Sequence, residues 1–203
     1  MRSASLVRGI GINSGEYPAY RDRKNVKEYI LWGNMLDRCK GNYWEKHPTY
    51  IGTTCSENFK SYSFFYEWCQ QQKGFKTEDE FGARKVWHLD KDILVRGNKV
   101  YSEDVCVFVP QRINKLLIKS NSTRGGQTIG VCWHNRDCVF VAQCCNSDDK
   151  HKHLGYFDTE QEAFLVYKAY KEALIKQVAE QYKSQIDIRV YDALIKYEVS
   201  RND

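Results

Sequence analysis

The segment spanning residues 84–118 constrains the fold of this chain most, because strand-forming and turn-forming stretches alternate within a short distance. Residues 86–94 (VWHLDKDIL) are rich in aliphatic and aromatic side chains, which predicts a strand. A Gly-Asn loop follows, and residues 106–109 (CVFV) predict a second strand. A helix is predicted to open near Pro110. The segment therefore indicates a strand, a tight loop, a second strand and a helix.

This order of elements resembles the ββα-metal motif of HNH-type nucleases. In that motif a strand supplies a general base beside a metal ligand, and a helix returns a second ligand to the same metal. Family members place an acidic ligand and a His side by side, then an Asn in the loop and an Asn on the helix. If Asp90 takes the ligand position, Lys91 stands where the base His is expected. Asn98 then takes the orienting position in the loop of the motif, and Asn114 is the second metal ligand.

A second alignment of the sequence with the motif retains a general base. If His88 is the base, the motif puts Trp87 at the ligand position, and an indole cannot bind a metal. However, His88 and Asp90 are two residues apart on a strand, so they project from the same face. A shifted site is therefore chemically consistent, with His88 as base and Asp90 and Asn114 as ligands of Mg²⁺ or another divalent ion. The alternative interpretation is a site that has lost its catalytic function, in which Asp90 pairs locally and Asn114 caps a helix.

The bulk composition sets further limits. Of the 203 residues, 42% are hydrophobic and 28% charged, as is ordinary for a soluble globular protein. The net charge of +5 permits nucleic-acid binding without demanding it. The apolar stretches are far shorter than the roughly 20 residues of a membrane span, and the first residues lack the apolar core of a secretion leader. We therefore expect a cytoplasmic protein with no membrane partner.

Eight cysteines raise the question of disulfides or zinc. They form no C-x2-C pair, and the five histidines do not complete a finger spacing. Cys144 and Cys145 are adjacent, so on a strand they point to opposite faces and do not easily share one tetrahedral ion. We expect reduced thiols and no structural zinc.

Residues 1 to about 80 are predicted to be helical and rich in loops. Two apolar stripes recur at helical spacing and predict a shared core. Their members are Tyr29, Trp32, Met35, Leu36 and Cys39, followed by Phe59, Tyr62, Phe64, Phe65, Trp68 and Cys69. Between the stripes, the loop 43–52 carries basic and aromatic residues, among them Lys46, His47 and Tyr50. We expect this loop to contact a partner.

From residue 129 onward the pattern predicts a small sheet followed by helices. The expected elements are strands at 129–134, 139–145 and 151–157, a long helix after Thr159, and a last amphipathic helix within 184–203. Thr159 and Glu162 have the spacing of a capping box. The apolar face of the long helix is predicted at Ala163, Val166, Tyr167 and Tyr170. The last helix is expected to dock on the molecule or to form a dimer, and the oligomeric state stays open.

Two phrases of this part, Ile129-Gly130-Val131-x-Trp133 and the run from Leu154 to Ala163, resemble the plant ethylene-response-factor (Apetala-type) DNA-binding domain. Phrases in the N-terminal part, such as Trp32-x-x-Met35-Leu36-x-Arg38-Cys39, are similar to podovirus proteins. Those proteins are usually described as HNH endonucleases or DNA-binding proteins. The likeness implies double-stranded DNA as a partner and the cytoplasm of an infected bacterial host as the location.

The resemblance also implies which sheet face meets DNA. In plant-type domains, Arg and Trp side chains of one face enter the major groove. The corresponding residues here are Val139, Val141, Gln143 and Cys145, so binding is expected to be mostly electrostatic. An apolar face of this kind could equally bind a protein. The candidate DNA contacts are Trp133, His134, Arg136, Gln143, Lys150, Lys152 and, in the linker, Arg124.

Together these observations predict an α+β protein. Residues 1–118 would hold N-terminal helices and the HNH-like ββα core, residues 119–128 a polar linker, and residues 129–203 the Apetala-type sheet, its helix and a C-terminal helix. The resemblance implies a phage DNA-binding protein of the HNH homing-endonuclease type, with metal-dependent nicking or cleavage if the site is intact. The alternative is an inactive relative that binds and inhibits a host defence protein.

Overall fold

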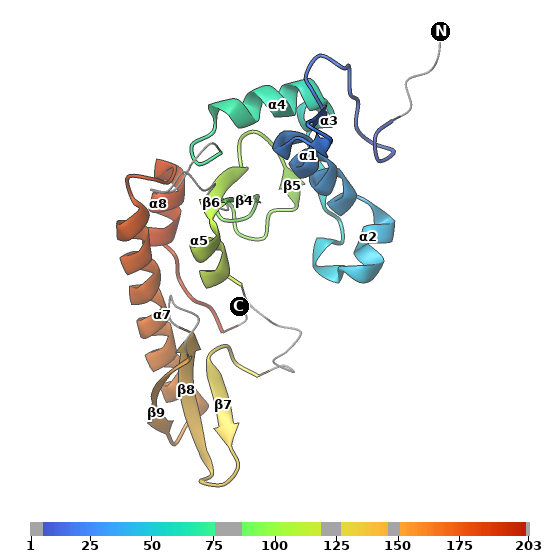
Figure 1. Ribbon diagram of the computed structural model, residues 1–203. Coiled ribbons are helices and arrows are strands. Elements are labelled where there is room, and N and C mark those ends of the chain that lie inside the picture. Colours follow the sequence, from blue (N-terminus) through green and yellow to red (C-terminus); the bar gives the residue numbers. More distant parts are fainter. Residues whose placement is uncertain (1–5, 76–86, 119–126, 146–150, 202–203) are drawn as a thin grey trace. The chain divides into compact units, whose positions relative to one another are not determined.

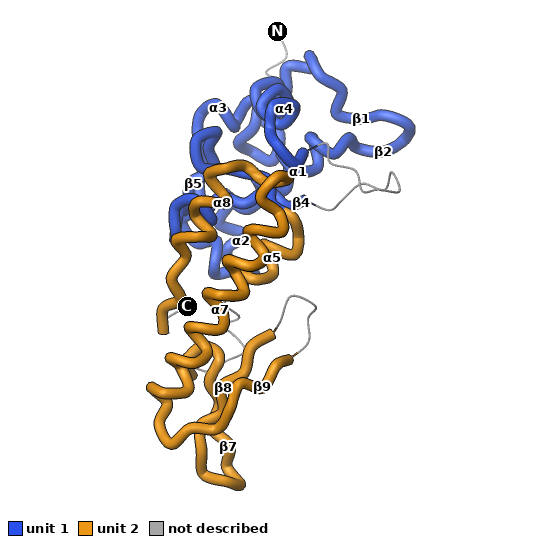
Figure 2. The backbone as a smooth tube through the Cα atoms, turned by 90° about the vertical axis from the view of Figure 1, so that its left-hand side faces the viewer, with its two compact units in different colours: residues 1–109 blue, residues 110–203 orange. Residues whose placement is uncertain are grey.

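The computed structural model describes residues 6–75, 87–118, 127–145 and 151–201 (Figure 1). Helices and short strands are mixed along these residues, so the expected α+β class is confirmed. The chain divides into two compact units, residues 1–109 and 110–203 (Figure 2). This division precedes the predicted linker at 119–128, most of which lies outside the described residues. The helix that follows Pro110 therefore groups with the second unit.

The first unit is built from short helices and very short strands. Its elements are β1 (Tyr20–Arg21), β2 (Lys24–Asn25), α1 (Lys27–Arg38), α2 (Gly41–Lys46), the 3-10 helix η1 (Pro48–Tyr50), β3 (Thr54–Cys55), α3 (Glu57–Lys60), α4 (Tyr62–Gln71), β4 (Trp87–Asp90), β5 (Val100–Tyr101) and β6 (Val107–Pro110), the last of which ends at the division between the units. Ser56 and Ser61 begin α3 and α4 as N-caps, because each hydroxyl accepts a hydrogen bond from a backbone N–H of the first turn.

The two predicted apolar stripes form the core of this unit. Trp32, Met35 and Leu36 of α1 are fully buried, and Phe59 and Phe65 pack in the same core. The Trp32 indole N–H donates to the carbonyl oxygen of Phe59 at 2.8 Å, which satisfies the one polar group of this side chain. Three predicted core members, Tyr29, Cys39 and Phe64, are only half-buried.

The predicted strand at 86–94 is shorter than expected. Regular strand structure ends at Asp90, and residues 91–99 form turns. The expectation was wrong beyond Asp90 because that carboxylate binds the backbone N–H groups that follow, which bends the chain away from the sheet. The two-residue strand β5 pairs in parallel with β3, whereas β6 pairs with β4.

The second unit contains the predicted sheet and helices. Its elements are α5 (Gln111–Leu116), β7 (Val131–His134), β8 (Val139–Cys145), β9 (His151–Phe157), α7 (Glu160–Tyr182) and α8 (Ile188–Ile195). The three strands are antiparallel in the order β7–β8–β9. The capping box at the start of α7 is confirmed, since Thr159 and Glu162 bind each other's backbone N–H. Helix α8 packs on α7, which confirms the docked arrangement.

One face of the sheet packs on α7. Ala142 and Cys144 of β8 are buried on that side. On the helix, Phe164 and Tyr167 are buried, whereas Val166, predicted to be apolar and inward, is 37% exposed. Gly130 allows the close approach, because a Cβ atom there would lie 2.1 Å from the Tyr167 ring.

A bulge interrupts the pairing of β8 with β9 between Ala142 and Gln143. Ala142 pairs with Gly155, whereas Gln143 pairs with His153, so β9 has one extra residue. Gly155 has a φ of 143°, a backbone conformation that favours glycine.

No helix in the described part of the chain is long and apolar enough to cross a membrane.

Candidate functional site

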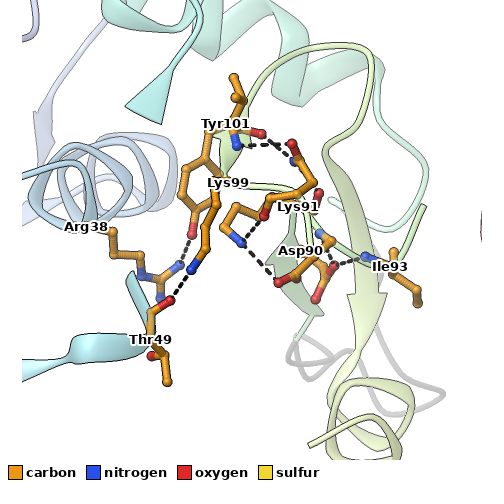
Figure 3. Close-up of polar contacts among 10 residues, drawn as sticks. Arg38, Thr49, Asp90, Lys91, Ile93, Lys99 and Tyr101 are labelled. Atoms are coloured by element: carbon orange, nitrogen blue, oxygen red, sulfur yellow. Dashed lines mark hydrogen bonds and ion pairs between the residues drawn. The ribbon is translucent and has the colours of Figure 1, made fainter. Parts of the chain in front are cut away.

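The predicted catalytic segment is centred on Asp90, which ends β4. One carboxylate oxygen, Oδ1, accepts hydrogen bonds from the backbone N–H of Asp92 at 3.0 Å and of Ile93 at 2.8 Å (Figure 3). Short side chains that bind the backbone two and three residues ahead stabilise turns. Burial, and then the neighbouring Asp92 carboxylate, raise the pKa of Asp90. These hydrogen bonds give Asp90 a turn-forming role.

Lys91 stands where one register of the motif expects a base, and its side chain is only 8% exposed. Its ammonium group donates to the carbonyl oxygen of Asn98 at 2.8 Å and to a carboxylate oxygen of Asp92 at 3.0 Å. The ammonium also lies 5.8 Å from the centre of the Tyr101 ring. Through these two hydrogen bonds the buried lysine side chain joins the two ends of the loop 91–98.

Asn98 closes the same loop from its other end. Its amide nitrogen donates to the carbonyl oxygens of Lys91 and Val100, both at 2.7 Å. Its amide oxygen accepts from the backbone N–H of Val100 at 3.1 Å. Both amide hydrogens and the oxygen are therefore engaged with backbone groups. The structure gives Asn98 a role in shaping the loop, next to the orienting role that the resemblance implies.

His88 is half-buried on β4. Burial and the positive charge of Arg38 lower its pKa, which favours the neutral imidazole at neutral pH. A neutral imidazole is the form that a general base requires. Asn114, the predicted second metal ligand, lies on α5 of the second unit. The predicted set thus draws His88, Asp90 and Asn98 from the first unit and Asn114 from the second.

The donors of this segment fit a turn better than a magnesium site. Magnesium prefers an octahedron of oxygen ligands, usually with several waters and one or two carboxylates. Here Asp90 already accepts two backbone hydrogen bonds through one oxygen, and Asp92 is paired with the Lys91 ammonium. Within the described ranges, no three His, Cys, Asp or Glu side chains are grouped so that they could hold a metal ion. The metal role of Asp90 and Asn114 stays a prediction.

Two substitutions at Asp90 separate these roles. Asp90→Asn is expected to change the free energy of unfolding by less than about 1 kcal/mol, because the amide oxygen still accepts both backbone hydrogen bonds. Asp90→Ala is expected to cost roughly 1–3 kcal/mol, since two partly buried N–H groups lose their acceptor. Urea denaturation at neutral pH measures both values. Equal losses in the two variants would contradict the turn-forming role.

The second candidate site is the sheet face that points away from α7, here called the outer face. Strand pairing places Cys132, Val141 and Tyr156 in one row across the sheet, and Gln143 beside His153 in another. Gln143 and Cys145 are exposed, whereas Ala142 and Cys144, on the other face, are buried. Alternation along β8 puts Val139, Val141, Gln143 and Cys145 on the face opposite the helix, where Val141 is buried and Gln143 and Cys145 are exposed.

The predicted DNA contacts divide between the two faces. His134 pairs with Val139 and lies on the outer face with Gln143. Trp133 pairs with Phe140 on the α7 side, where the two rings are 4.8 Å apart. Lys152 pairs with the buried Cys144, and its ammonium lies 4.9 Å from the Tyr170 ring of α7. Strand alternation thus places Trp133 and Lys152 on the α7 side of the sheet, and their role as DNA contacts stays a prediction.

The remaining predicted contacts lie at the edges. Arg136 is exposed in the turn between β7 and β8, 3.9 Å from Asp137. Lys150 and Arg124 lie outside the described residues.

Sequence reasoning missed three outer-face residues on β9: His151, His153 and Tyr156. Tyr156 is 60% exposed, and the His153 and Tyr156 rings lie 4.6 Å apart. The Cys145 thiol lies 3.6 Å from a ring nitrogen of His151. The alternation of β8 with its partner strand is the signal that could have found these residues, but the bulge shifts it.

Comparison with known proteins adds no relative: no family model matches the chain, and no curated protein or solved structure is significantly similar to it. The function is therefore inferred from the geometry of the two candidate sites.

Proposed function

We propose that this chain binds double-stranded DNA through the outer face of the β7–β8–β9 sheet. The observation that carries the proposal is the set of exposed side chains on three adjacent strands, with α7 covering the opposite face. His134, Gln143 and Tyr156 supply donors, acceptors and an aromatic surface. Glutamine can bind an adenine edge through two hydrogen bonds, and a strand-borne surface can enter the major groove.

The proposed class is a phage DNA-binding protein related to HNH homing endonucleases, acting in the cytoplasm of an infected bacterium. The hydrogen bonds of Asp90, Lys91 and Asn98 within their own loop favour binding without cleavage. The alternative is a metal-dependent nuclease that uses His88, Asp90 and Asn114, and incubation of supercoiled plasmid with Mg²⁺ or Mn²⁺ distinguishes the two. We expect the plasmid to be bound and to stay intact.

A second candidate function is favoured by the centre of the outer face. Val141 lies between Cys132 and Tyr156; Val141 is buried, Cys132 is half-buried and the Tyr156 ring is 60% exposed, so an aromatic surface lies over an apolar centre. Apolar patches of this kind also bind proteins. On this alternative the chain would bind and inhibit a host defence protein. Loss of DNA binding in every assay below, with a partner captured through this face, would support it.

Two outer-face variants of the full chain test DNA binding. His153→Ala and Tyr156→Ala are each expected to weaken binding to a short duplex roughly tenfold, since one base-edge contact contributes about 1–3 kcal/mol. Lys152→Ala is the matched control: it neighbours His153 in sequence but faces α7, and it should leave affinity within about twofold despite the loss of a charge. Fluorescence anisotropy measures all three. A larger effect of Lys152→Ala than of the other two would contradict the proposed face.

A further inference from the structure

A cluster of basic and aromatic side chains surrounds η1 in the first unit. Arg38, at the end of α1, donates from Nη1 to the Tyr101 hydroxyl at 3.1 Å. Its guanidinium lies 5.4 Å from the centre of the Tyr50 ring and also hydrogen-bonds Tyr43. The Trp44 indole donates to the Arg38 carbonyl oxygen at 2.8 Å, which fixes the end of α1 against α2. The guanidinium is thus held in one orientation.

A second cation reaches the same turn. The Lys99 ammonium donates to the carbonyl oxygen of Thr49, the residue before Tyr50. The backbone of Lys99 is fixed as well, because its carbonyl oxygen accepts from the N–H of Thr54 at 2.8 Å. Figure 3 shows Arg38 and Lys99 near the hydroxyl end of Tyr101, with the Lys99 ammonium directed at Thr49.

Among the residues that the structure describes, no carboxylate forms an ion pair with Arg38 or Lys99, whereas Lys91 is paired with Asp92. Residues 41–54 contain a single acidic residue, Glu45. Lys99 is exposed, and Arg38 is half-buried. A half-buried guanidinium without a carboxylate favours an anionic ligand, because a charge removed from water is stable only when it is paired.

We propose that the Arg38–Lys99 cluster at η1 is a phosphate-binding site that takes a phosphate of the nucleic-acid backbone. Arginine presents parallel N–H donors that match two phosphate oxygens, and lysine adds a point charge. The Tyr43 and Tyr101 hydroxyls orient the guanidinium and leave its other donors for the ligand.

The inference rests on the proposed DNA-binding function for the source of the phosphate, but it concerns a different unit of the chain. Binding of a short duplex by the full chain is measured over a salt series for wild type, Lys99→Ala and Arg38→Lys. Lys99→Ala is expected to weaken binding roughly three- to tenfold for unrelated sequences and to reduce the slope of log affinity against log salt by about 0.9. Arg38→Lys keeps the charge and loses the paired donors, so we expect weaker binding with a nearly unchanged slope.

Lys73→Ala is the matched control, because Lys73 is an exposed lysine of the same unit outside the cluster. A second arm measures thermal unfolding in inorganic phosphate against chloride at equal ionic strength. Stabilisation by phosphate in wild type, absent in Lys99→Ala and Arg38→Lys, supports the site even if duplex binding fails. A phosphate effect without a duplex effect assigns the site to free phosphate and overturns the backbone source. Wild-type behaviour of both variants in both arms, or a slope change in Lys73→Ala as large as in Lys99→Ala, overturns the proposal.

Discussion

Gly74→Ala is expected to destabilise the first unit by roughly 3 kcal/mol or more, because overpacking and a strained backbone add together. Gly74 follows α4 and has a φ of 91°, and a Cβ atom there would lie 2.2 Å from the Trp87 ring. Trp87 is buried and begins β4, the strand that carries His88 and Asp90. Neither the tryptophan ring nor the backbone at Gly74 can move without disturbing that strand.

Gly97→Ala separates the two causes. Gly97 has a φ of 77°, similar to that of Gly74, but a Cβ atom at Gly97 would meet nothing within 4 Å, so only the backbone cost remains. That cost is about 1 kcal/mol. Urea denaturation of both variants, followed by tryptophan fluorescence, gives the two free energies of unfolding. Equal losses would show that the contact between Gly74 and Trp87 does not limit the packing of β4.

Asn98→Ala is expected to lower the free energy of unfolding by roughly 2–4 kcal/mol, because three hydrogen bonds to backbone groups are lost at once. The variant leaves the Lys91 and Val100 carbonyl oxygens without their donor and removes the acceptor of the Val100 N–H. Asn42→Ala, at an exposed position of α2, is the control and should cost less than about 0.5 kcal/mol. An unchanged free energy of unfolding in Asn98→Ala would contradict the role of Asn98 in shaping the loop.

Local patterns predicted the fold well where the energetic cause is itself local. The capping box of Thr159 and Glu162 needs only residues three apart, and the stripe around Trp32 needs only helical spacing. The end of β4 was missed because a strand-like composition continues past Asp90, while the side chain of Asp90 binds the next N–H groups. Here one side chain outweighs the propensity of several.

The candidate sites depend on contacts that spacing does not reveal. Arg38 meets Tyr101 and Tyr50 only after α1, η1 and β5 have packed, so its environment is not readable from its neighbours in sequence. The faces of Trp133 and Lys152 could not be predicted, because alternation defines two faces but not which of them receives α7. That choice is made by Ala142 and Cys144, whose small side chains admit the helix.

The bulge in β9 determines which of its residues share the outer face. His153 and Tyr156 are three residues apart, a spacing that puts side chains on opposite faces of an uninterrupted strand. The extra residue brings both rings to the same face. Loss of the extra residue would restore regular alternation and leave His151, His153 and Tyr156 on the outer face, because the same partners on β8 would still be opposed. The imidazole and phenol groups of this face are therefore expected to survive a one-residue deletion at the bulge, whereas a deletion closer to the His151 end would shift the register of the residues beyond it.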